Sequence, residues 1–349
     1  MVTQTLETQE MKVAVIILNW NGEALLREFL PSVLRFTNPD LARIIVVDNG
    51  SQDTSLEVLK KEFPDVEVMP FDQNYGFAGG YNKAIEKLKE EYLVLLNSDV
   101  EVTQGWLQPL VAVLDENPLV AAVQPKIKAY TEKEKFEYAG ACGGFIDKWG
   151  YPFCRGRILD IMEHDSGQYD DVREVFWASG AAFCVRREYY TQCGGLDEAF
   201  FAHMEEIDLC WKLRNAGYII KVCPLSTVYH LGGGSLPMQH PKKLFLNYRN
   251  DLLMLYKNLP RKESRKVLIV RSLFDIASFI VFVLKGEFKN AASVYKAYRS
   301  FWGMRKNYTQ KANSPFVHGS ACRHSCMYRG SIVLAYFLRR VKKFSELTF

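Results

Sequence analysis

The chain has 349 residues, 48% of them hydrophobic, so it can bury a sizeable core and form about two domains. Its 8 cysteines are scattered along the chain, which favours reduced thiols in the cytosol and argues against a disulfide framework. The segment Met1–Glu10 is polar and acidic, so we expect no signal peptide.

The formal net charge of +4 is divided unequally along the chain. Residues 241–349 carry 22 Lys and Arg against 5 Asp and Glu, a net charge of +17, whereas residues 1–240 carry 22 and 35, a net charge of −13. This division predicts a globular head, 1–240, followed by a basic region, 241–349. The basic region would meet an anionic partner, either a membrane surface or a nucleic acid.

Buried strands alternate with helical patterns through the first part of the chain. Apolar, mostly β-branched runs predict strands at 12–18, 44–47, 66–69 and 92–97. Helical spacing follows each of the first three runs, after a glycine-rich turn in the third case. The alternation is typical of an α/β fold with a doubly wound, mostly parallel sheet flanked by helices.

Polar residues stand where several of these strands end. They are Asn19, Asp48, Asn97 and Asp99. Ligands of open α/β sheets bind outside the carboxyl ends of the strands, so these side chains are candidates for a binding site. Asp99 offers a hard oxygen ligand to Mg²⁺ or Mn²⁺, and the alternative is that it only caps a turn.

The glycine-rich turn 74–82 contains Asn74 and Gly79 and opens the third helix. Backbone N–H groups at such a helix start can approach a phosphate, although glycine pairs also serve close helix–strand packing. The dinucleotide fingerprint G-x-G-x-x-G is missing after the first strand, and so is a Walker A sequence. NAD-binding proteins and ordinary P-loop NTPases are therefore disfavoured.

The rest of the head contains further strand patterns, at 119–127, 175–186 and 222–228. We expect the glycine- and aromatic-rich segment 138–157 to be a packed loop, although its aromatic side chains could also form an acceptor wall. The run 175–186 contains Trp177 and is broken by Ser179 and Gly180, whose small size would let a ligand approach the backbone.

Three acidic residues, Glu205, Glu206 and Asp208, open a predicted helix. Glu205 and Asp208 share a helix face, whereas Glu206 points elsewhere. Acids in a first turn can also serve only the helix dipole. Farther along, His230 follows a strand and precedes a glycine loop, where it is either structural or a metal ligand.

Four segments, Val15–Gly22, Val46–Ser51, Asn74–Asn82 and Leu95–Asp99, resemble the successive motifs of family 2 glycosyltransferases, and the rhamnosyltransferase-like members most of all. Phe200–Arg214 resembles the family segment that has an aromatic pair, then Glu-Asp-x-Asp-Leu, then Arg. The resemblance covers about residues 11–235. It implies the GT-A fold, a nucleotide-sugar donor and inversion of the anomeric centre.

The resemblance also assigns roles. Glu206 falls at the general base, where the family usually has Asp, and Asn97 replaces the usual first acid of the metal motif. Asp99 and His230 would then hold a divalent ion. The donor nucleotide would be bound by Asn19, Asp48, Asn74, Gly79 and Asn97. The acceptor or supporting residues would be Glu205, Asp208, Trp177, Ser179 and Gly180.

The basic region is predicted to be helical. An amphipathic helix is expected at 244–259, and its Arg249 and Asn250 resemble a family element that follows the catalytic core. The apolar run 267–284 is interrupted by Arg271 and Asp275, so we expect an interfacial helix or one packed on the head, not a span. The segment 331–343 suits an anionic membrane surface. Cys322 and Cys326 have the spacing of half a zinc site, but a second ligand pair is missing.

The resemblance therefore implies an inverting glycosyltransferase that moves a sugar from a nucleotide-diphosphate donor, of which dTDP-rhamnose is one candidate, to a hydroxyl of a glycan or lipid-linked acceptor in cell-surface polysaccharide synthesis. We expect a divalent cofactor, a cytoplasmic protein peripheral on the cytoplasmic face of the membrane, and no nucleic acid partner; a helical hairpin could also mediate a homo-oligomer. The alternatives are a nucleic-acid-binding α/β protein with a basic tail and a sugar nucleotidyltransferase.

Overall fold

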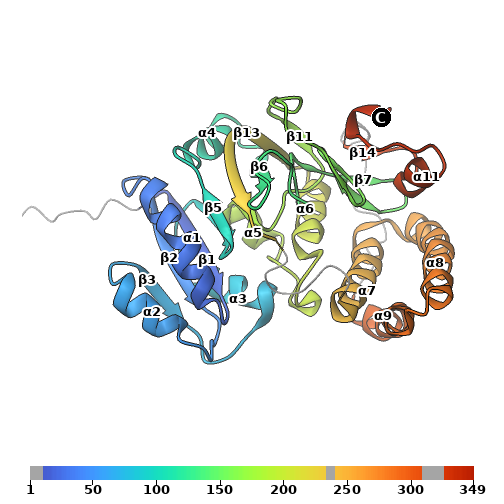
Figure 1. Ribbon diagram of the computed structural model, residues 1–349, viewed down its shortest axis with the longest axis horizontal. Coiled ribbons are helices and arrows are strands. Elements are labelled where there is room, and N and C mark those ends of the chain that lie inside the picture. The colour runs from blue at the N-terminus through green and yellow to red at the C-terminus, as the bar shows by residue number, and fades with distance from the viewer. Residues whose placement is uncertain (1–10, 233–239, 309–325) are drawn as a thin grey trace, which may run out of the picture.

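The computed structural model describes residues 11–232, 240–308 and 326–349 (Figure 1). Its centre is a nine-stranded sheet with the order β11-β13-β6-β12-β4-β1-β2-β3, and β5 pairs with β13 beside this path. Helices cover both faces of the sheet. The predicted α/β class is confirmed.

The first half of the sheet is built from alternating strands and helices. The elements are β1 (Val13–Asn19), α1 (Glu23–Phe36), β2 (Ala42–Asp48), α2 (Ser55–Glu62), β3 (Glu67–Pro70), α3 (Gly76–Ile85) and β4 (Tyr92–Asn97). Strands β1 to β4 are parallel to one another, and the side chains of β1 and β4 are almost all buried because helices cover both of their faces. In this register Asn19 lies opposite Asp48, and Leu18 lies opposite Asn97.

The second half of the sheet is mixed. Its elements are β5 (Val100–Val102), α4 (Gln108–Glu116), β6 (Val120–Ala129), β11 (Arg173–Val175), β12 (Ala182–Arg186), α5 (Arg187–Gln192), η1 (Glu198–Phe200), α6 (Glu205–Asn215) and β13 (Ile219–His230). Strands β6 and β13 run in the direction of β4, whereas β5, β11 and β12 run against it. The sheet is thus mostly parallel, with the antiparallel β12 inserted between β4 and β6.

A smaller sheet with the order β10-β9-β8-β7-β14 corrects one prediction. Its strands are β7 (Gly144–Asp147), β8 (Pro152–Cys154), β9 (Arg157–Ile158), β10 (Ile161–Met162) and β14 (Met327–Tyr328). The segment 138–157 therefore forms strands and is not simply a loop. The reason is long-range packing, since Phe145 and Phe153 are fully buried against Phe344 and Phe349 from the end of the chain.

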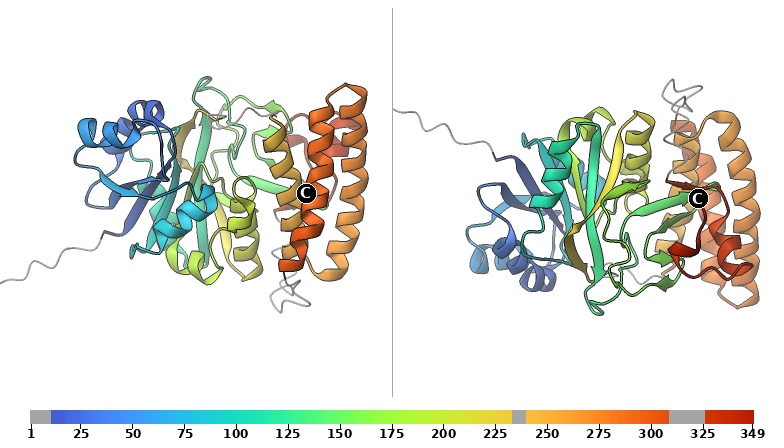
Figure 2. Two further views of the ribbon diagram at one scale, coloured as in Figure 1. Left: turned by 90° about the horizontal axis from the view of Figure 1, so that it is seen from below. Right: turned by 90° about the horizontal axis from the view of Figure 1, so that it is seen from above.

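The basic region forms a group of three helices, α7 (Pro241–Asn258), α8 (Arg261–Leu284) and α9 (Phe288–Met304), at one end of the molecule (Figure 2). Helix α7 packs on α6, while α8 and α9 form the outer side (Figure 1). Within the segment 331–343, α11 covers Ile332–Phe337, and η4 (Phe344–Glu346) follows it.

The two charges within the apolar run of α8 point into the protein. Arg271 and Asp275 are 3% and 2% exposed, and Arg271 pairs with Asp251 of α7. Tyr298 of α9 donates to Oδ2 of Asp275 over 2.7 Å. Among the described residues, α8 is the single helix long and apolar enough to cross a membrane, and 17% of its most apolar stretch is buried within the protein. Its charged side chains thus fasten it to α7 and α9.

Candidate active site at the carboxyl ends of the strands

The first part of the site is the junction of β1 and β2. Asn19 and Asp48 are 0% and 1% exposed, and Nδ2 of Asn19 donates to Oδ1 of Asp48 over 3.2 Å. The other Asp48 oxygen accepts from the backbone N–H of Ser51 (3.1 Å), whereas Oδ1 of Asn19 has no hydrogen-bond partner. An unpaired buried acceptor is costly, so this edge has an unmet hydrogen-bonding capacity.

The second part brings Asp99 and His230 together. Strand β13 pairs with β5 so that His230 lies opposite Val100, and Nε2 of His230 is 3.1 Å from Oδ1 of Asp99. Nδ1 of the same ring is 3.4 Å from Oε1 of Glu137. Burial alone would lower the pKa of His230, but the carboxylates of Glu137 and Asp99 outweigh it and raise the pKa to about 10. Nδ2 of Asn97 lies 3.4 Å from the Nε2 atom.

The charge of His230 acts in return on Asp99. Burial would raise the pKa of Asp99, but the positive charge and hydrogen bond of His230 lower it below its usual value. No group of three or more His, Cys, Asp or Glu side chains suited to a metal is present in the described ranges. Asp99 and His230 are thus a buried pair of opposite charge, not a complete metal centre.

The third part is the glycine-rich turn that begins α3. Asn74 Oδ1 accepts from the backbone N–H of Gly76, whose φ of +75° favours glycine. Asn49 was not predicted as a site residue, yet it supports this turn: its Oδ1 accepts from the N–H of Tyr75 and its Nδ2 donates to the carbonyl of Gly76. Its position directly after Asp48 at a strand end was the signal that could have identified it.

The glycines of the turn differ in their surroundings. A Cβ on Gly80 would lie 2.8 Å from the side chain of Leu18, so Gly80 is required for packing between helix and strand. A Cβ on Gly79 would meet the Cβ of Tyr75 at 3.3 Å and the carboxyl group of Glu198 at 3.7 Å. Close packing therefore accounts for Gly80, and Gly79 faces the turn and a polar neighbour.

The fourth part is the head of α6. Glu205 and Asp208 are 4% and 0% exposed. Asp208 is fully satisfied, since it pairs with Lys257 (2.8 Å) and accepts from Nδ2 of Asn258 (2.7 Å), both on α7. In contrast, Oε2 of Glu205 and Oε2 of Glu206 are buried without hydrogen-bond partners. The three acids thus separate into one that holds α6 to α7 and two that each have a carboxylate oxygen buried without a partner.

Burial controls the protonation of the two unpaired acids. It raises the pKa of Glu206 to about 7, and burial together with the neighbouring Glu206 raises the pKa of Glu205 well above its usual range. A carboxyl group that titrates near neutral pH suits general base catalysis, because it can both be ionised and accept a proton in that range. A helix-dipole role alone does not require such burial.

The residues between β11 and β12 line the same region. A Cβ on Gly180 would lie 3.8 Å from both Cβ and Cδ of Glu206 and 3.5 Å from the ring of Phe77 in α3. The backbone N–H of Asn97 donates to the carbonyl of Ala181, next in the chain. Gly180 therefore lies where the head of α6, the start of α3 and the end of β4 meet.

Ser179 and Trp177 lie deeper. The backbone N–H of Ser179 donates to Oε1 of Gln124 (2.9 Å), and the Ser179 hydroxyl donates to the carbonyl of Ala139. Trp177 is 4% exposed and its indole N–H donates to the carbonyl of Phe145 (2.9 Å). Both side chains thus contact the smaller sheet and the segment before it.

Glu137 is the second residue that sequence reasoning missed. It is 6% exposed, and it reaches His230 because the chain after β6 turns back antiparallel to the end of β6, beside which β13 runs. No periodicity or motif around residue 137 indicates this contact, since it depends on a turn between β6 and the smaller sheet that the sequence does not predict.

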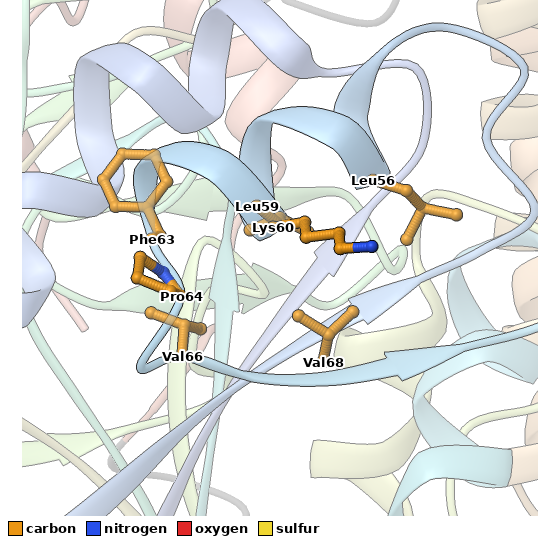
Figure 3. Close-up of a pocket in the computed structure, with 7 residues that line it drawn as sticks. All are labelled: Leu56, Leu59, Lys60, Phe63, Pro64, Val66 and Val68. Atoms are coloured by element: carbon orange, nitrogen blue, oxygen red, sulfur yellow. The ribbon is translucent and has the colours of Figure 1, made fainter.

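A hollow on the surface lies apart from these groups. It is lined by side chains of α2, β3 and the turn between them: Leu56, Leu59, Lys60, Phe63, Pro64, Val66 and Val68 (Figure 3). It contains none of the predicted site residues and is apolar apart from one lysine. The candidate site is therefore the edge where β1, β2, β4 and β13 end.

The mixed sheet, with helices on both faces and polar residues at its strand ends, has the GT-A fold. Solved structures agree: TarS 1-349 of S. aureus, in complex with UDP-GlcNAc, has a TM-score of 0.56 at 17% identity, over 83% of this chain and 80% of that one. GalNAc-T7 with UDP, GalNAc and Mn²⁺ has a TM-score of 0.53 at 18% identity, over 71% and 48%. The mannosyltransferase PcManGT from Pyrobaculum calidifontis, with GDP-Man and Mn²⁺, has 0.51 at 14%, over 90% and 81%.

The sequence comparisons support the resemblance that the motifs predicted. Residues 14–169 match glycosyl transferase family 2. The chain is 26% identical over 259 residues to the N-acetylglucosaminyl-diphospho-decaprenol L-rhamnosyltransferase of Mycobacterium tuberculosis, covering 69% of this chain and 83% of that relative. It is 27% identical over 226 residues to the pre-mycofactocin glycosyltransferase of the same organism, covering 58% and 43%.

Proposed function

We propose that this glycosyltransferase inverts the anomeric centre in a single displacement with Glu206 as the general base. The observation that carries the proposal is the position of Glu206: its Oε2 atom is buried without a partner, it adjoins Gly180, which also faces Phe77, and its pKa is raised to about 7. In this mechanism Glu206 takes the proton of an acceptor hydroxyl while that oxygen attacks the anomeric carbon. The bond between that carbon and the nucleotide diphosphate breaks through an oxocarbenium-like transition state, as in other glycosyl transfers.

The donor would lie along the polar strand ends. Asn19 and Asp48 would hold the base and ribose, and the unpaired Oδ1 of Asn19 supports this role. Asn74, Gly79 and Asn97 would border the diphosphate. The backbone of α3 begins at this place, and its dipole favours negative charge there, although the N–H groups of Tyr75, Gly76 and Phe77 already have acceptors in the protein.

A divalent ion, Mg²⁺ or Mn²⁺, fits Asp99 and His230 only in part. Their Oδ1 and Nε2 atoms are 3.1 Å apart and supply two ligands of suitable type, so the phosphates of the donor would have to supply the others. When bound, the ion would stabilise the charge that builds on the departing diphosphate. The carboxylates of Glu137 and Asp99 raise the pKa of His230, so Nε2 would have to lose its proton before it could bind the ion.

Replacing Glu206 by Gln tests the base directly. The substitution removes the proton acceptor but keeps the size, so transfer should fall by about 10³-fold while donor affinity stays nearly constant. Glu206→Asp is the matched control, because it restores the residue usual in the family and should keep transfer within about 100-fold of the native rate. Loss of donor binding in Glu206→Gln, or full activity, would refute the assignment.

For substrates we propose dTDP-rhamnose as donor and a lipid-linked or glycan hydroxyl as acceptor, in cell-surface polysaccharide synthesis. The support is the likeness to a relative named as a rhamnosyltransferase that acts on a diphospho-decaprenol acceptor. A thermal-shift screen of nucleotide sugars, with and without Mn²⁺, tests the donor. Release of the nucleoside diphosphate with sugar transfer distinguishes this reaction from nucleotidyl transfer, which would release pyrophosphate.

We also propose that residues 241–349 place the enzyme on the cytoplasmic face of a membrane as a peripheral protein, with no nucleic acid partner. One face of α8 carries exposed apolar side chains at helical spacing, Ile269, Leu273, Ile276, Ile280 and Leu284, which we call the α8 stripe. Exposed basic residues stand at both of its ends: Lys262, Arg265, Lys266 and Lys285. An apolar stripe bordered by lysine and arginine is suited to lie in the plane of an anionic bilayer.

Sedimentation with liposomes tests this contact. The protein should pellet with vesicles of phosphatidylcholine and phosphatidylglycerol and much less with phosphatidylcholine alone. Ile276→Glu combined with Ile280→Glu should weaken pelleting by about 10-fold or more, since both charges would enter the interface. Leu225→Glu is the control, because Leu225 is 75% exposed on β13, outside the stripe. A stable homo-oligomer that buries the stripe and shows no lipid binding would refute the membrane contact.

A further inference from the structure

The segment 197–204, which leads into α6, has an unusual backbone. Phe201, His203 and Met204 have φ values of +65°, +70° and +71°, in the left-handed region that side-chain-bearing residues rarely adopt. Each such residue costs about 1 kcal/mol or more, so the conformation persists only where neighbouring groups hold it. Met204 is also the N-cap of α6, so this backbone fixes where the helix begins and where Glu206 points.

Two adjacent residues of α7 hold this segment. Asn250 is 0% exposed, and its Nδ2 faces three carbonyl oxygens, those of Phe200 (3.0 Å), Ala202 (2.9 Å) and His203 (2.8 Å). Arg249 donates through Nη2 to the carbonyl of Phe200 (3.0 Å) and also to that of the preceding residue. Nε of Arg249 donates to Oδ1 of Asn250 (2.9 Å), which fixes the orientation of the amide.

The same segment contacts the glycine-rich turn. The carbonyl of Phe201 accepts from the backbone N–H of Phe77 (3.0 Å), and a Cβ on Gly76 would overlap the ring of Phe201 at 2.8 Å. The left-handed backbone at Phe201 directs that carbonyl toward α3. The segment thus joins the turn proposed to border the donor diphosphate to the helix that carries the proposed base.

We propose that Asn250, assisted by Arg249, is a positioning residue for Glu206: it holds 197–204 in its strained conformation, so that the base and the glycine-rich turn keep a fixed separation. This inference rests on the proposed role of Glu206. Asn250 itself lies behind the segment and is fully buried, so its effect on transfer must pass through the backbone of 197–204. The basic helical region would then serve catalysis as well as location.

The experiment compares three variants in the full chain. Asn250→Ala removes the donors to three buried carbonyls, and Arg249→Gln, at a partly exposed position, is the milder variant that keeps the proposal testable if the first does not fold. Leu255→Val is the matched control, since Leu255 is a fully buried residue of α7 that packs near Gly150 and not near 197–204. We would measure kcat per folded molecule, the donor Kd, and hydrogen exchange of the peptide 197–208.

The expected result is a loss in kcat without a matching loss in donor affinity. Asn250→Ala should lower kcat by about 100-fold, and Arg249→Gln by about 10-fold, because misplacement of a reacting group by about 1 Å costs this much. The donor Kd should change by less than about 3-fold, the peptide should exchange faster, and Leu255→Val should keep kcat within about 2-fold. A kcat per folded molecule that is unchanged in Arg249→Gln and Asn250→Ala, or a loss confined to donor affinity, would overturn the proposal.

A double-substitution cycle separates this proposal from that for Glu206. If Asn250 acts through the base, adding Asn250→Ala to Glu206→Gln should change the residual rate by less than about 3-fold. If the double variant lost kcat by the product of the two single losses, the two residues would act independently and the positioning role would be overturned. If Glu206→Gln alone keeps the native rate, the proposed base is wrong. If Asn250→Ala is slow in the same comparison, the failure then lies in the assignment of Glu206 and not in the effect of Asn250 on transfer.

Discussion

At the head of α6 and the end of β13 the protein buries carboxylates, whereas along α8 it leaves large apolar side chains in water. The first region holds Glu205 and Glu206 without partners for one oxygen each. The second exposes Leu273 by 64% and Leu284 by 81%. Each arrangement costs stability: the first buries polar groups without partners, and the second exposes apolar surface to water. Neither is needed to fold a sheet covered by helices. Departures of this kind are expected where residues serve function, so the comparison supports the proposed reaction site and the proposed contact surface.

The largest effect is expected at the buried His–Asp pair. Asp99→Asn should lower transfer by about 10³-fold and remove the dependence on Mn²⁺, since it removes the carboxylate proposed as a ligand. Transfer rates at increasing Mn²⁺ would show this. Glu101→Ala is the control, because Glu101 is a nearby acid that pairs at the surface with Lys133. Unchanged metal dependence in Asp99→Asn would contradict the ligand role.

The next effect concerns a buried acid that does have partners. Lys257→Met removes the nearer of two cations from the buried Asp208, which keeps the hydrogen bond from Asn258 and a longer contact with Lys212 (3.7 Å), and should lower the free energy of unfolding by about 3 kcal/mol. Urea denaturation measures the change. Lys61→Met breaks an exposed pair with Glu57 and should change stability by less than about 0.5 kcal/mol. If Lys257→Met and Lys61→Met changed the free energy of unfolding equally, burial of the Asp208–Lys257 pair would contribute nothing to stability.

Glu206 should lower stability in a pH-dependent way. Its pKa is about 7 in the folded protein and 4.5 ordinarily, so the folded state binds the proton more tightly and loses stability as pH rises from about 4.5 to 7. Glu206→Gln should therefore raise the free energy of unfolding by about 1–3 kcal/mol at pH 8 and leave it nearly unchanged at pH 4. Urea denaturation at both pH values measures this, and a stabilisation that is equal at the two would contradict the assigned cause.

The smallest effect should be found on α8. Ile276→Ser replaces a side chain that is 55% exposed and should alter the free energy of unfolding by less than about 0.5 kcal/mol. Leu252→Ala, at a position of α7 that is 1% exposed, should cost about 2–5 kcal/mol. If Ile276→Ser proved as costly as Leu252→Ala, the α8 stripe would belong to the fold and not to a contact surface.

The first half of the fold could be predicted because its signals are local. Runs such as 12–18 and 92–97 are apolar throughout, and a strand buried on both faces has this pattern regardless of its neighbours. The polar residues Asn19, Asp48 and Asp99 were found in the same way, since each directly follows such a run. Helix and strand ends differ from the predicted ones by a few residues, as terminal turns depend on caps.

The remainder depends on contacts between distant segments. The smaller sheet could not be predicted because β7 is completed by β14, and Glu137 could not be found because its partner His230 lies on a strand formed much later in the chain. Asn250 was noted only for its resemblance to a family element. Its three carbonyl partners come from a backbone with left-handed residues, a conformation that the local sequence does not favour.

The pairing of β14 with β7 has a consequence for synthesis of the protein. The N–H of Phe344 donates to Oε1 of Glu163 across a separation of 181 residues, and Phe344 and Phe349 fill the space beside Phe145. The head therefore cannot complete its smaller sheet on the ribosome until 327–349 have emerged. Until then Phe145 and Phe153 would stay open to water or to chaperones, which makes early release or truncation near residue 326 a route to aggregation.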